Sequence, residues 1–281
     1  MRDPFKITEP TCISFSGGRT SAYMLWRVLQ SNDGLPSDAV VCFANTGKEE
    51  EATLRFVQQC SDEWSVPIAW VEYMPHEETR KRFRVVNFET ASRNGEPLEA
   101  VIRRKQYLPN PVTRFCTVET KIRTMANFLL SIGMVDSQAE GERVSMIGIR
   151  ADEPLRAAKV AEKWRVPLYL SGVDVHEVGA FWSRQPFNLE LPTYNGRTLA
   201  GNCDLCFLKP ANQIFTLIQE RPERAIWWAK MEALALALAS KPSGAVFRSD
   251  RPSYQQMLDY SQQQQNLFDL HEDSIGCFCG D

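Results

Sequence analysis

The chain has 281 residues, of which 43% are hydrophobic and 24% are charged, and its formal net charge is -3 at pH 7. This composition is ordinary for a folded globular protein, and the small net charge excludes a chain that is polycationic along its whole length. No apolar run approaches the roughly 20 residues that a membrane-spanning helix needs. The first ten residues carry no apolar signal-peptide core, so we expect a cytoplasmic protein that does not bind a membrane.

Strand and helix patterns alternate in the first quarter of the chain. Apolar runs of strand length lie at 11–16, 39–45 and 68–73. Between them, apolar residues recur at helical spacing over 21–30 and 48–64, and the second of these stretches begins with acidic residues, as helix starts prefer. The alternation predicts βαβ units and an α/β fold, with a twisted, mainly parallel sheet and helices on both faces.

The rest of the chain is less regular. Its expected elements are, in chain order, a helix at 121–133, a strand that runs into a polar loop at 143–153, a strand at 166–172, a short helix at 174–185, a helical stretch at 211–241 that breaks near Pro222, and a polar helix at 253–270. We therefore expect an α/β domain over residues 1–210 and a helical C-terminal extension with a cysteine-containing tail over residues 211–281.

The segment between the first strand and the first helix reads Ser16-Gly17-Gly18-Arg19-Thr20-Ser21. Glycines after a strand let the backbone approach a ligand, and the helix that follows adds N–H groups and the positive end of its dipole. The serine and threonine hydroxyls and the Arg19 guanidinium are further donors for phosphate oxygens. The pattern predicts a phosphate-binding loop, although a plain strand–turn–helix gives the same local pattern. The Gly-Lys-Ser/Thr ending of a Walker A loop is absent.

This loop resembles the PP-loop, Ser-Gly-Gly-x-x-Ser, of the adenine nucleotide alpha hydrolase superfamily. Three later segments, in family order, resemble the phosphoadenosine phosphosulfate (PAPS) reductase family. FANTGKEEEAT (43–53) is similar to its Asp-Thr-Gly segment, GIRADEPLR (148–156) to its Gly-x-Arg-x-x-Glu stretch and DVHEVGAFW (174–182) to its Asp-Val-Trp-Glu segment. The chain departs from the family at Arg19 and Thr20 (Lys-Asp in the family), at Asn45 (Asp) and at His176 (Trp).

The resemblance implies an enzyme that binds an adenine nucleotide and carries out sulfur chemistry beside it. The loop at 16–21 is expected to hold phosphate or sulfate, and Asn45, Thr46 and Gly47 are expected to shape the nucleotide pocket. Arg150 follows a strand, so it lies at the sheet edge where open α/β sheets bind ligands. Lys121 resembles a family lysine that faces the anionic ligand. Arg150 and Lys121 are therefore candidate catalytic residues.

Eight cysteines are spread along the chain. Cys12 and Cys42 lie in apolar, strand-like runs, and we expect them to be small core residues. Cys60 lies near the end of a helical stretch and carries no local signal. Without an export signal, metal or redox chemistry is favoured over disulfides for the remaining five. Cys203 and Cys206 form a C-x₂-C pair, a spacing that lets two sulfurs reach one metal centre. Cys116 adds a third thiol.

The resemblance implies that Cys116, Cys203 and Cys206 hold a [4Fe–4S] cluster, which normally takes four thiolates. Cys277 or Cys279 in the tail is the candidate fourth ligand. The tail also stands where PAPS reductases carry a nucleophilic cysteine, so Cys277 and Cys279 are alternatively a nucleophile and its resolving thiol. A cluster with one open iron, a zinc ion in place of iron and sulfur, and a tail pair without a role are also left open.

The expected function is reduction of a sulfonucleotide, either PAPS or adenosine phosphosulfate (APS), with thioredoxin or a similar thiol donor as partner. In the alternative, the substrate is ATP, and the enzyme adenylates tRNA or DNA, releases pyrophosphate and inserts sulfur. The basic segment at 101–105 favours that branch because nucleic acids carry dense negative charge. A nucleotide-binding regulatory subunit is the non-enzymatic alternative, and a homodimer is left open.

Overall fold

The computed structural model describes residues 3–134, 144–194, 197–201, 203–238 and 245–263. By their internal contacts the residues group into two compact units, and each is described by itself. Unit 1 comprises Met1–Ala100 and Cys116–Cys203, and unit 2 comprises Val101–Phe115 and Asp204–Asp281.

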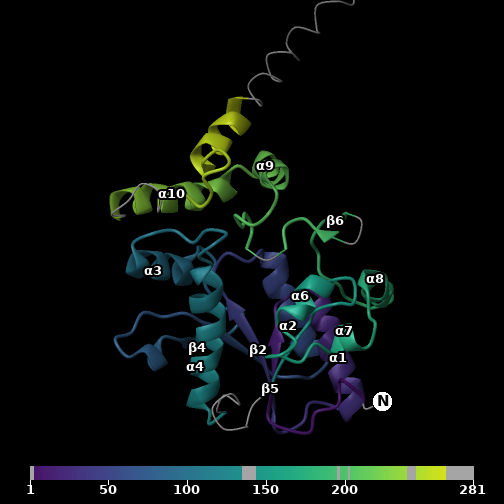
Figure 1. Ribbon diagram of the computed structural model, residues 1–281. Helices are drawn as coiled ribbons and strands as arrows, with labels where there is room; N and C mark the ends of the chain where they lie inside the picture. The colour runs from purple at the N-terminus through teal and green to yellow at the C-terminus, as the bar shows by residue number, and fades with distance from the viewer. Residues whose placement is uncertain (1–2, 135–143, 195–196, 202, 239–244, 264–281) are drawn as a thin grey trace, which may run out of the picture. The chain divides into compact units, whose positions relative to one another are not determined.

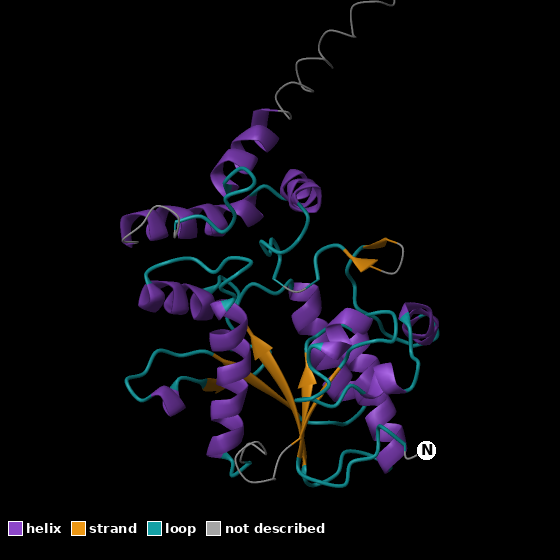
Figure 2. Ribbon diagram, viewed as in Figure 1, coloured by secondary structure: helices purple, strands orange, loops and turns teal. Residues whose placement is uncertain are grey.

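Unit 1 is built on a five-stranded sheet, drawn in orange in Figure 2. Its strands are β1 (Thr11–Phe15), β2 (Ala39–Asn45), β3 (Ile68–Glu72), β4 (Arg84–Val86) and β5 (Val144–Ile147), in the order β4-β3-β2-β1-β5. Neighbouring strands are parallel except β3 and β4, which are antiparallel. The sheet grows from β1 in one direction through β2 and in the other through β5, so β1 marks the point where ligands bind in open α/β sheets.

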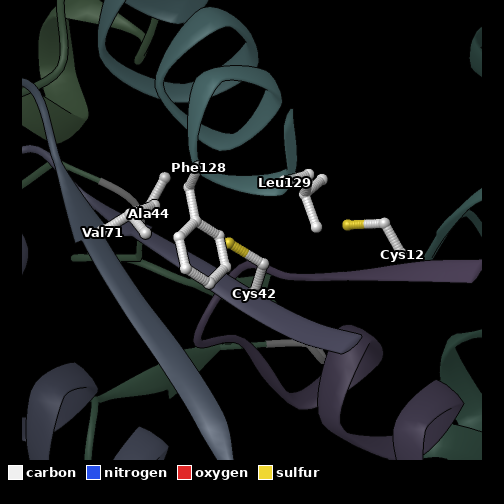
Figure 3. Packing of buried hydrophobic residues seen from close by; sticks show 6 residues of the cluster. All are labelled: Cys12, Cys42, Ala44, Val71, Phe128 and Leu129. Atoms are coloured by element: carbon white, nitrogen blue, oxygen red, sulfur yellow. The ribbon is translucent and has the colours of Figure 1, made fainter. Parts of the chain in front are cut away.

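Helices cover both faces of this sheet, which confirms the predicted fold class. α1 (Arg19–Asn32) and α2 (Glu51–Glu63) follow β1 and β2, and α4 (Thr124–Ser131) packs against β2 and β3 (Figure 1). Figure 3 shows the layer beneath α4, in which four sheet residues meet two from the helix. These residues are Cys12, Cys42, Ala44, Val71, Phe128 and Leu129. Cys12 and Cys42 are therefore core residues, as predicted.

Strand alternation directs the other set of side chains to the opposite face, against α1 and α2. Ile13, Val41 and Phe43 alternate with the residues of Figure 3 and are fully or almost fully buried. The core therefore consists of two apolar layers, one on each side of the sheet.

The remaining elements of unit 1 are short. They are the 3-10 helix η1 (Thr79–Lys81), the π-helix η2 (Thr117–Arg123), α6 (Pro154–Ala158), α7 (Pro167–Leu170), α8 (Val175–Trp182), and the strand pair β6 (Thr193–Tyr194) and β7 (Arg197–Thr198). α3 (Glu96–Lys105) begins in unit 1 and continues into unit 2. The helix expected at 121–133 is therefore α4 preceded by a π-helical turn, and α8 confirms the short helix expected at 174–185.

The strand expected at 166–172 is wrong, because α7 occupies this segment. Extended pairing does begin just before it, where Arg165 forms a parallel bridge with Met146. Pro167 then stands at the first turn of α7, where its fixed φ suits a helix and its missing N–H could not extend a ladder. The apolar composition of the segment hid this signal.

Unit 2 is helical in its described part. α9 (Ala211–Glu220) and α10 (Glu223–Leu238) meet at Pro222, which confirms the predicted break. Residues 254–263 are also helical, and the rest of the helix expected at 253–270 lies outside the described residues. Trp228, Phe247 and Tyr254 pack together with ring centroids 5.0–5.5 Å apart. Each described helix of the chain is too short or too polar to cross a membrane.

The packing beneath α4 predicts that two neighbouring leucines contribute very differently to the free energy of unfolding. Leu129 is 1% exposed and Leu130 is 39% exposed. Leu129→Ala should lower the free energy of unfolding by about 2–5 kcal/mol because it leaves a cavity under α4. Leu130→Ala, the matched control, should change it by less than about 0.5 kcal/mol. Chemical denaturation measures both, and equal losses would contradict the packing described.

Candidate functional site

The loop that follows β1 turns sharply into α1. Gly17 has φ +74°, and a methyl group there would lie 2.7 Å from Cγ2 of Thr53 on α2, so only glycine fits this position. Gly18 caps α1 and offers no side-chain hydrogen bond to it. The first N–H groups of a helix have no partner within the helix, and they form the positive end of its dipole. The loop can therefore bind an anion at the carboxyl edge of the sheet.

Two serine side chains close the loop on itself. The hydroxyls of Ser16 and Ser21 lie 2.9 Å apart, and Oγ of Ser21 also accepts from the Ser16 N–H at 3.1 Å and donates to the Gly18 carbonyl. Ser21 is buried. It therefore fixes the shape of the loop, whereas Ser16 is more accessible.

The end of β5 approaches the same helix turn. A methyl group on Gly148 would lie 3.1 Å from Cα of Ser21, closer than nearly all such contacts. Two residues later, Nη1 of Arg150 donates to Oγ1 of Thr20 at 3.1 Å. The fold thus brings Arg150 to the loop, although 130 residues separate it from Thr20.

Arg150 is held as a cation. Its Nε and Nη2 donate to both carboxylate oxygens of Asp152, at 2.8 and 2.9 Å. These hydrogen bonds raise the pKa of Arg150 and lower the pKa of the Asp152 carboxyl. Its side chain is 21% exposed. The guanidinium is thus held beside the anion-binding loop, with Asp152 and, at 3.8 Å, Glu153 as its counter-ions.

Arg19 has partners within the protein. Its Nε donates to Oδ1 of Asn188 at 2.7 Å, and its Nη2 donates to the Leu189 carbonyl at 2.6 Å. Burial lowers the pKa of its guanidinium. The side chain therefore ties the start of α1 to the 188–189 segment in this conformation.

Asn45 ends β2 in a buried polar network. Its Nδ2 donates to Oε1 of Glu72 at 2.6 Å and to the Ser92 carbonyl at 2.9 Å, while its Oδ1 accepts from the Gly47 N–H at 3.0 Å. Asn45 and Glu72 are both 0% exposed. An amide can donate to Glu72, whereas an ionised aspartate would face it with a like charge. The network therefore favours Asn over Asp at position 45.

Glu49 joins residues that the sequence predicted separately. Its carboxylate accepts from the N–H and the Oγ1 hydroxyl of Thr46, each at 2.9 Å, and it lies 3.6 Å from Nζ of Lys121. Its backbone forms an antiparallel bridge with Cys203. The side chain of Glu49 is only 2% exposed. Sequence reasoning missed this role, because Glu49 lies in an acidic run that resembles an ordinary helix start.

Cys203 contacts this group through Thr46, whose Oγ1 lies 3.4 Å from its Sγ. A threonine hydroxyl has one proton, and here it is donated to Glu49, which only accepts. The Cys203 S–H therefore donates to Thr46. The structure thus brings together Thr46, Lys121 and Cys203, with Glu49 as the common neighbour of all three.

The segment that carries Lys121 is a π-helix. η2 begins immediately after Cys116, and Oγ1 of Thr120 donates to the Cys116 carbonyl at 2.7 Å. π-helical turns are rare, and many occur at functional sites. The wide turn contains Lys121 and follows Cys116 directly, so it links two predicted site residues.

The described cysteines fall into two classes. Cys12, Cys42 and Cys60 are buried, and burial raises the pKa of the Cys60 thiol. The three predicted ligands are partly exposed: Cys116 and Cys203 in unit 1, and Cys206 in unit 2. Within the described residues, no three His, Cys, Asp or Glu side chains gather closely enough to hold a metal ion. Cys277 and Cys279 lie outside the described residues.

The chain is an α/β protein of the doubly wound kind. Its sheet grows from β1 in both directions, and the glycine loop follows that strand. No family model matches the chain. It is 30% identical over 217 residues to the uncharacterized nin region protein ORF290 of Escherichia phage lambda, and the match covers 72% of this chain and 67% of that protein. The chain belongs to the family of this phage protein.

The Glu49 contacts predict a change in thiol reactivity. In Glu49→Gln the amide keeps one acceptor oxygen for Thr46, but the negative charge is lost and with it the pairing with Lys121. Loss of a nearby negative charge favours the thiolate of Cys203, which is the reactive form. We expect Cys203 to be alkylated several-fold faster, measured by mass spectrometry of its peptide. Glu51→Gln is the matched control, because Glu51 pairs with Arg93 instead. Equal alkylation rates in the two variants would refute the link from Glu49 to Cys203.

The Glu72 network predicts the cost of an acid in place of Asn45. Asn45→Asp removes a donor to Glu72 and adds a buried like charge, so the free energy of unfolding should fall by about 2–4 kcal/mol. In the control Asn110→Asp, the replaced side chain accepts hydrogen bonds from Val112 and Thr113, which a carboxylate can also do, and little change is expected. Chemical denaturation of both variants measures the difference. An unchanged stability for Asn45→Asp would show that the buried network does not discriminate Asn from Asp.

Proposed function

We propose that the chain is an enzyme of the PAPS reductase type, which binds the phosphate or sulfate end of an adenine nucleotide at the 16–21 loop and carries out sulfur chemistry beside it. The observation that carries the proposal is the convergence at the carboxyl edge of the sheet. The glycine turn, the start of α1 and the fixed cation of Arg150 meet there. Each of these features favours an anion, and they come from distant parts of the chain.

The group around Glu49 supports a second part of the proposal. In this group of side chains, Lys121 supplies a positive charge and Cys203 supplies a thiol. The group also includes Thr46 of the expected nucleotide pocket. In this proposal Lys121 binds the anionic substrate. Thr46 and Gly47 shape the nucleotide pocket. Asn45 supports Gly47 through the hydrogen bond to its N–H.

An iron–sulfur cluster is proposed from the chemistry of the thiols alone, since the described residues include no gathered set of metal ligands. Cys116, Cys203 and Cys206 are the three partly exposed cysteines among the described residues, and thiolates are the ligands that such clusters take. A fourth ligand would come from Cys277 or Cys279. When bound, the cluster would supply redox capacity. Zinc is the alternative metal, since it takes the same ligands.

The proposed reaction is the reduction of a sulfonucleotide by two thiols. A thiolate, for which Cys277 or Cys279 is the candidate, attacks the sulfur of the bound nucleotide and displaces the nucleoside phosphate. A second thiol, from the chain or from a donor such as thioredoxin, then attacks the cysteine sulfur, so that sulfite leaves and a disulfide forms. Two thiols are oxidised, and sulfur is reduced from the sulfate to the sulfite level.

One observation favours the alternative in which ATP is used to insert sulfur into tRNA or DNA. Arg103 and Arg104 lie in the last turn of α3 and are exposed. Exposed basic side chains attract the nucleic acid backbone. The same nucleotide loop would then hold the ATP phosphates, and pyrophosphate would leave.

Nucleotide binding by matched arginine variants tests the proposal. The anaerobically purified full chain is titrated with PAPS, APS and ATP by calorimetry. Arg150→Ala should raise the dissociation constant of the preferred nucleotide at least about tenfold, because a charge-assisted hydrogen bond is lost. Arg156→Ala is the control, since Arg156 is exposed and pairs with Glu153 at the surface. Absence of binding to all three nucleotides would overturn the proposal.

The same preparations separate the reactions. Release of sulfite from PAPS or APS with dithiothreitol supports the reductase, and exchange of pyrophosphate into ATP supports the sulfur-inserting enzyme. Nucleotide binding without either reaction would indicate the regulatory subunit. Iron, acid-labile sulfide and zinc are measured in parallel, with Cys203→Ala expected to lose the metal and the buried Cys60→Ala expected to keep it.

A further inference from the structure

A pocket lies at the other end of α1, away from the anion-binding loop. α1 has 14 residues and is therefore about 21 Å long. It begins at the glycine loop and ends beside the end of α2. The pocket has a volume of about 330 Å³, which is at the lower end of the range for small-molecule sites. Trp26, Asp33 and Trp64 are among the residues that line it, and all of its lining belongs to unit 1.

Two indole rings line this pocket, one from α1 and one from the residue that follows α2, and each contacts other aromatic rings. Trp26 of α1 stacks on Tyr23 with ring centroids 6.0 Å apart and lies 4.7 Å from Phe181. Trp64, at the end of α2, lies 5.8 Å from Phe187. Both tryptophans are partly exposed. Their positions are therefore fixed before any ligand arrives, which lowers the entropic cost of binding.

The electrostatics of the pocket favour a cation. α1 ends at Asn32 and α2 ends at Glu63, so the negative ends of two helix dipoles meet here. Asp33 is the charged residue among those that line the pocket. The C-terminal end of α1 already binds one cation, because Nζ of Lys6 donates to the Ser31 carbonyl at 3.0 Å. Lys6 is not among the residues that line the pocket.

We infer that this pocket binds a small organic cation, with a quaternary ammonium or guanidinium group against the indoles of Trp26 and Trp64 and near the Asp33 carboxylate. Aromatic faces attract such cations, and tryptophan does so most strongly. The inference is independent of the nucleotide site.

Binding of matched probes tests the charge preference. The full chain, labelled with ¹⁵N, is titrated with choline and with 3,3-dimethylbutan-1-ol, which has the same shape but no charge. Choline should shift the indole N–H signals of Trp26 and Trp64, and the neutral probe should bind at least about tenfold more weakly. Equal affinities, or no shift of these two signals at millimolar choline, would overturn the inference.

Variants test the site and the source of the cation. Asp33→Asn should weaken choline binding several-fold while it keeps the left-handed backbone of residue 33, which Asn adopts readily. Asp38→Asn is the matched control, because Asp38 is exposed, lies close in the chain and does not line the pocket. Equal weakening by both variants would contradict a local role for Asp33.

A comparison of agmatine with a blocked Gly-Arg-Gly peptide then distinguishes a free cation from a protein side chain. Tighter binding of agmatine indicates a free cation. Binding of the peptide that is at least as tight indicates a side chain.

Discussion

The buried carboxylate of Glu72 sets the main constraint on the carboxyl edge of unit 1. A charge without solvent exposure must be compensated by nearby donors or it destabilises the fold. Glu72 lies at the end of β3 and accepts hydrogen bonds from the side chains of Asn45 and Arg84 and from the backbone and hydroxyl of Ser92. One acid thus holds the end of β2, the edge strand β4 and the segment before α3 in fixed positions. The turn at Gly47 follows from this arrangement.

A second buried acid extends the same principle toward the thiols. Glu49 lies four residues after Asn45 and organises Thr46, Lys121 and Cys203 as Glu72 organises the strand ends. The two carboxylates therefore position different parts of one edge. The loop at 16–21 has other supports. It is shaped by close backbone packing, since Gly17 touches α2 and Gly148 touches the first turn of α1. Rigid support from several elements is what a binding site for a small anion requires.

The sequence predicted those parts of the fold that rest on local periodicity. The strands β1, β2 and β3 and the helices α1, α2 and α8 were expected within a few residues of their bounds, and Cys12 and Cys42 were expected in the core. The prediction failed at 166–172, where an apolar run is a helix that begins with Pro167. The grouping of Val101–Phe115 with the C-terminal part of the chain was also beyond sequence reasoning, because it depends on contacts between residues that are distant in the sequence.

For the site, motifs in the sequence identified the glycine loop and Arg150. Glu49 and Glu72 were missed because burial of an acid leaves no mark on its neighbours in the sequence.

We propose above all that the loop between β1 and α1 holds the phosphate or sulfate of an adenine nucleotide. Backbone hydrogen exchange, measured on the full chain with and without saturating PAPS or ATP, tests it most directly. The account predicts slower exchange in peptides that cover residues 16–22, where the N–H groups would donate to the anion. Bound nucleotide with unchanged exchange in those peptides would contradict it.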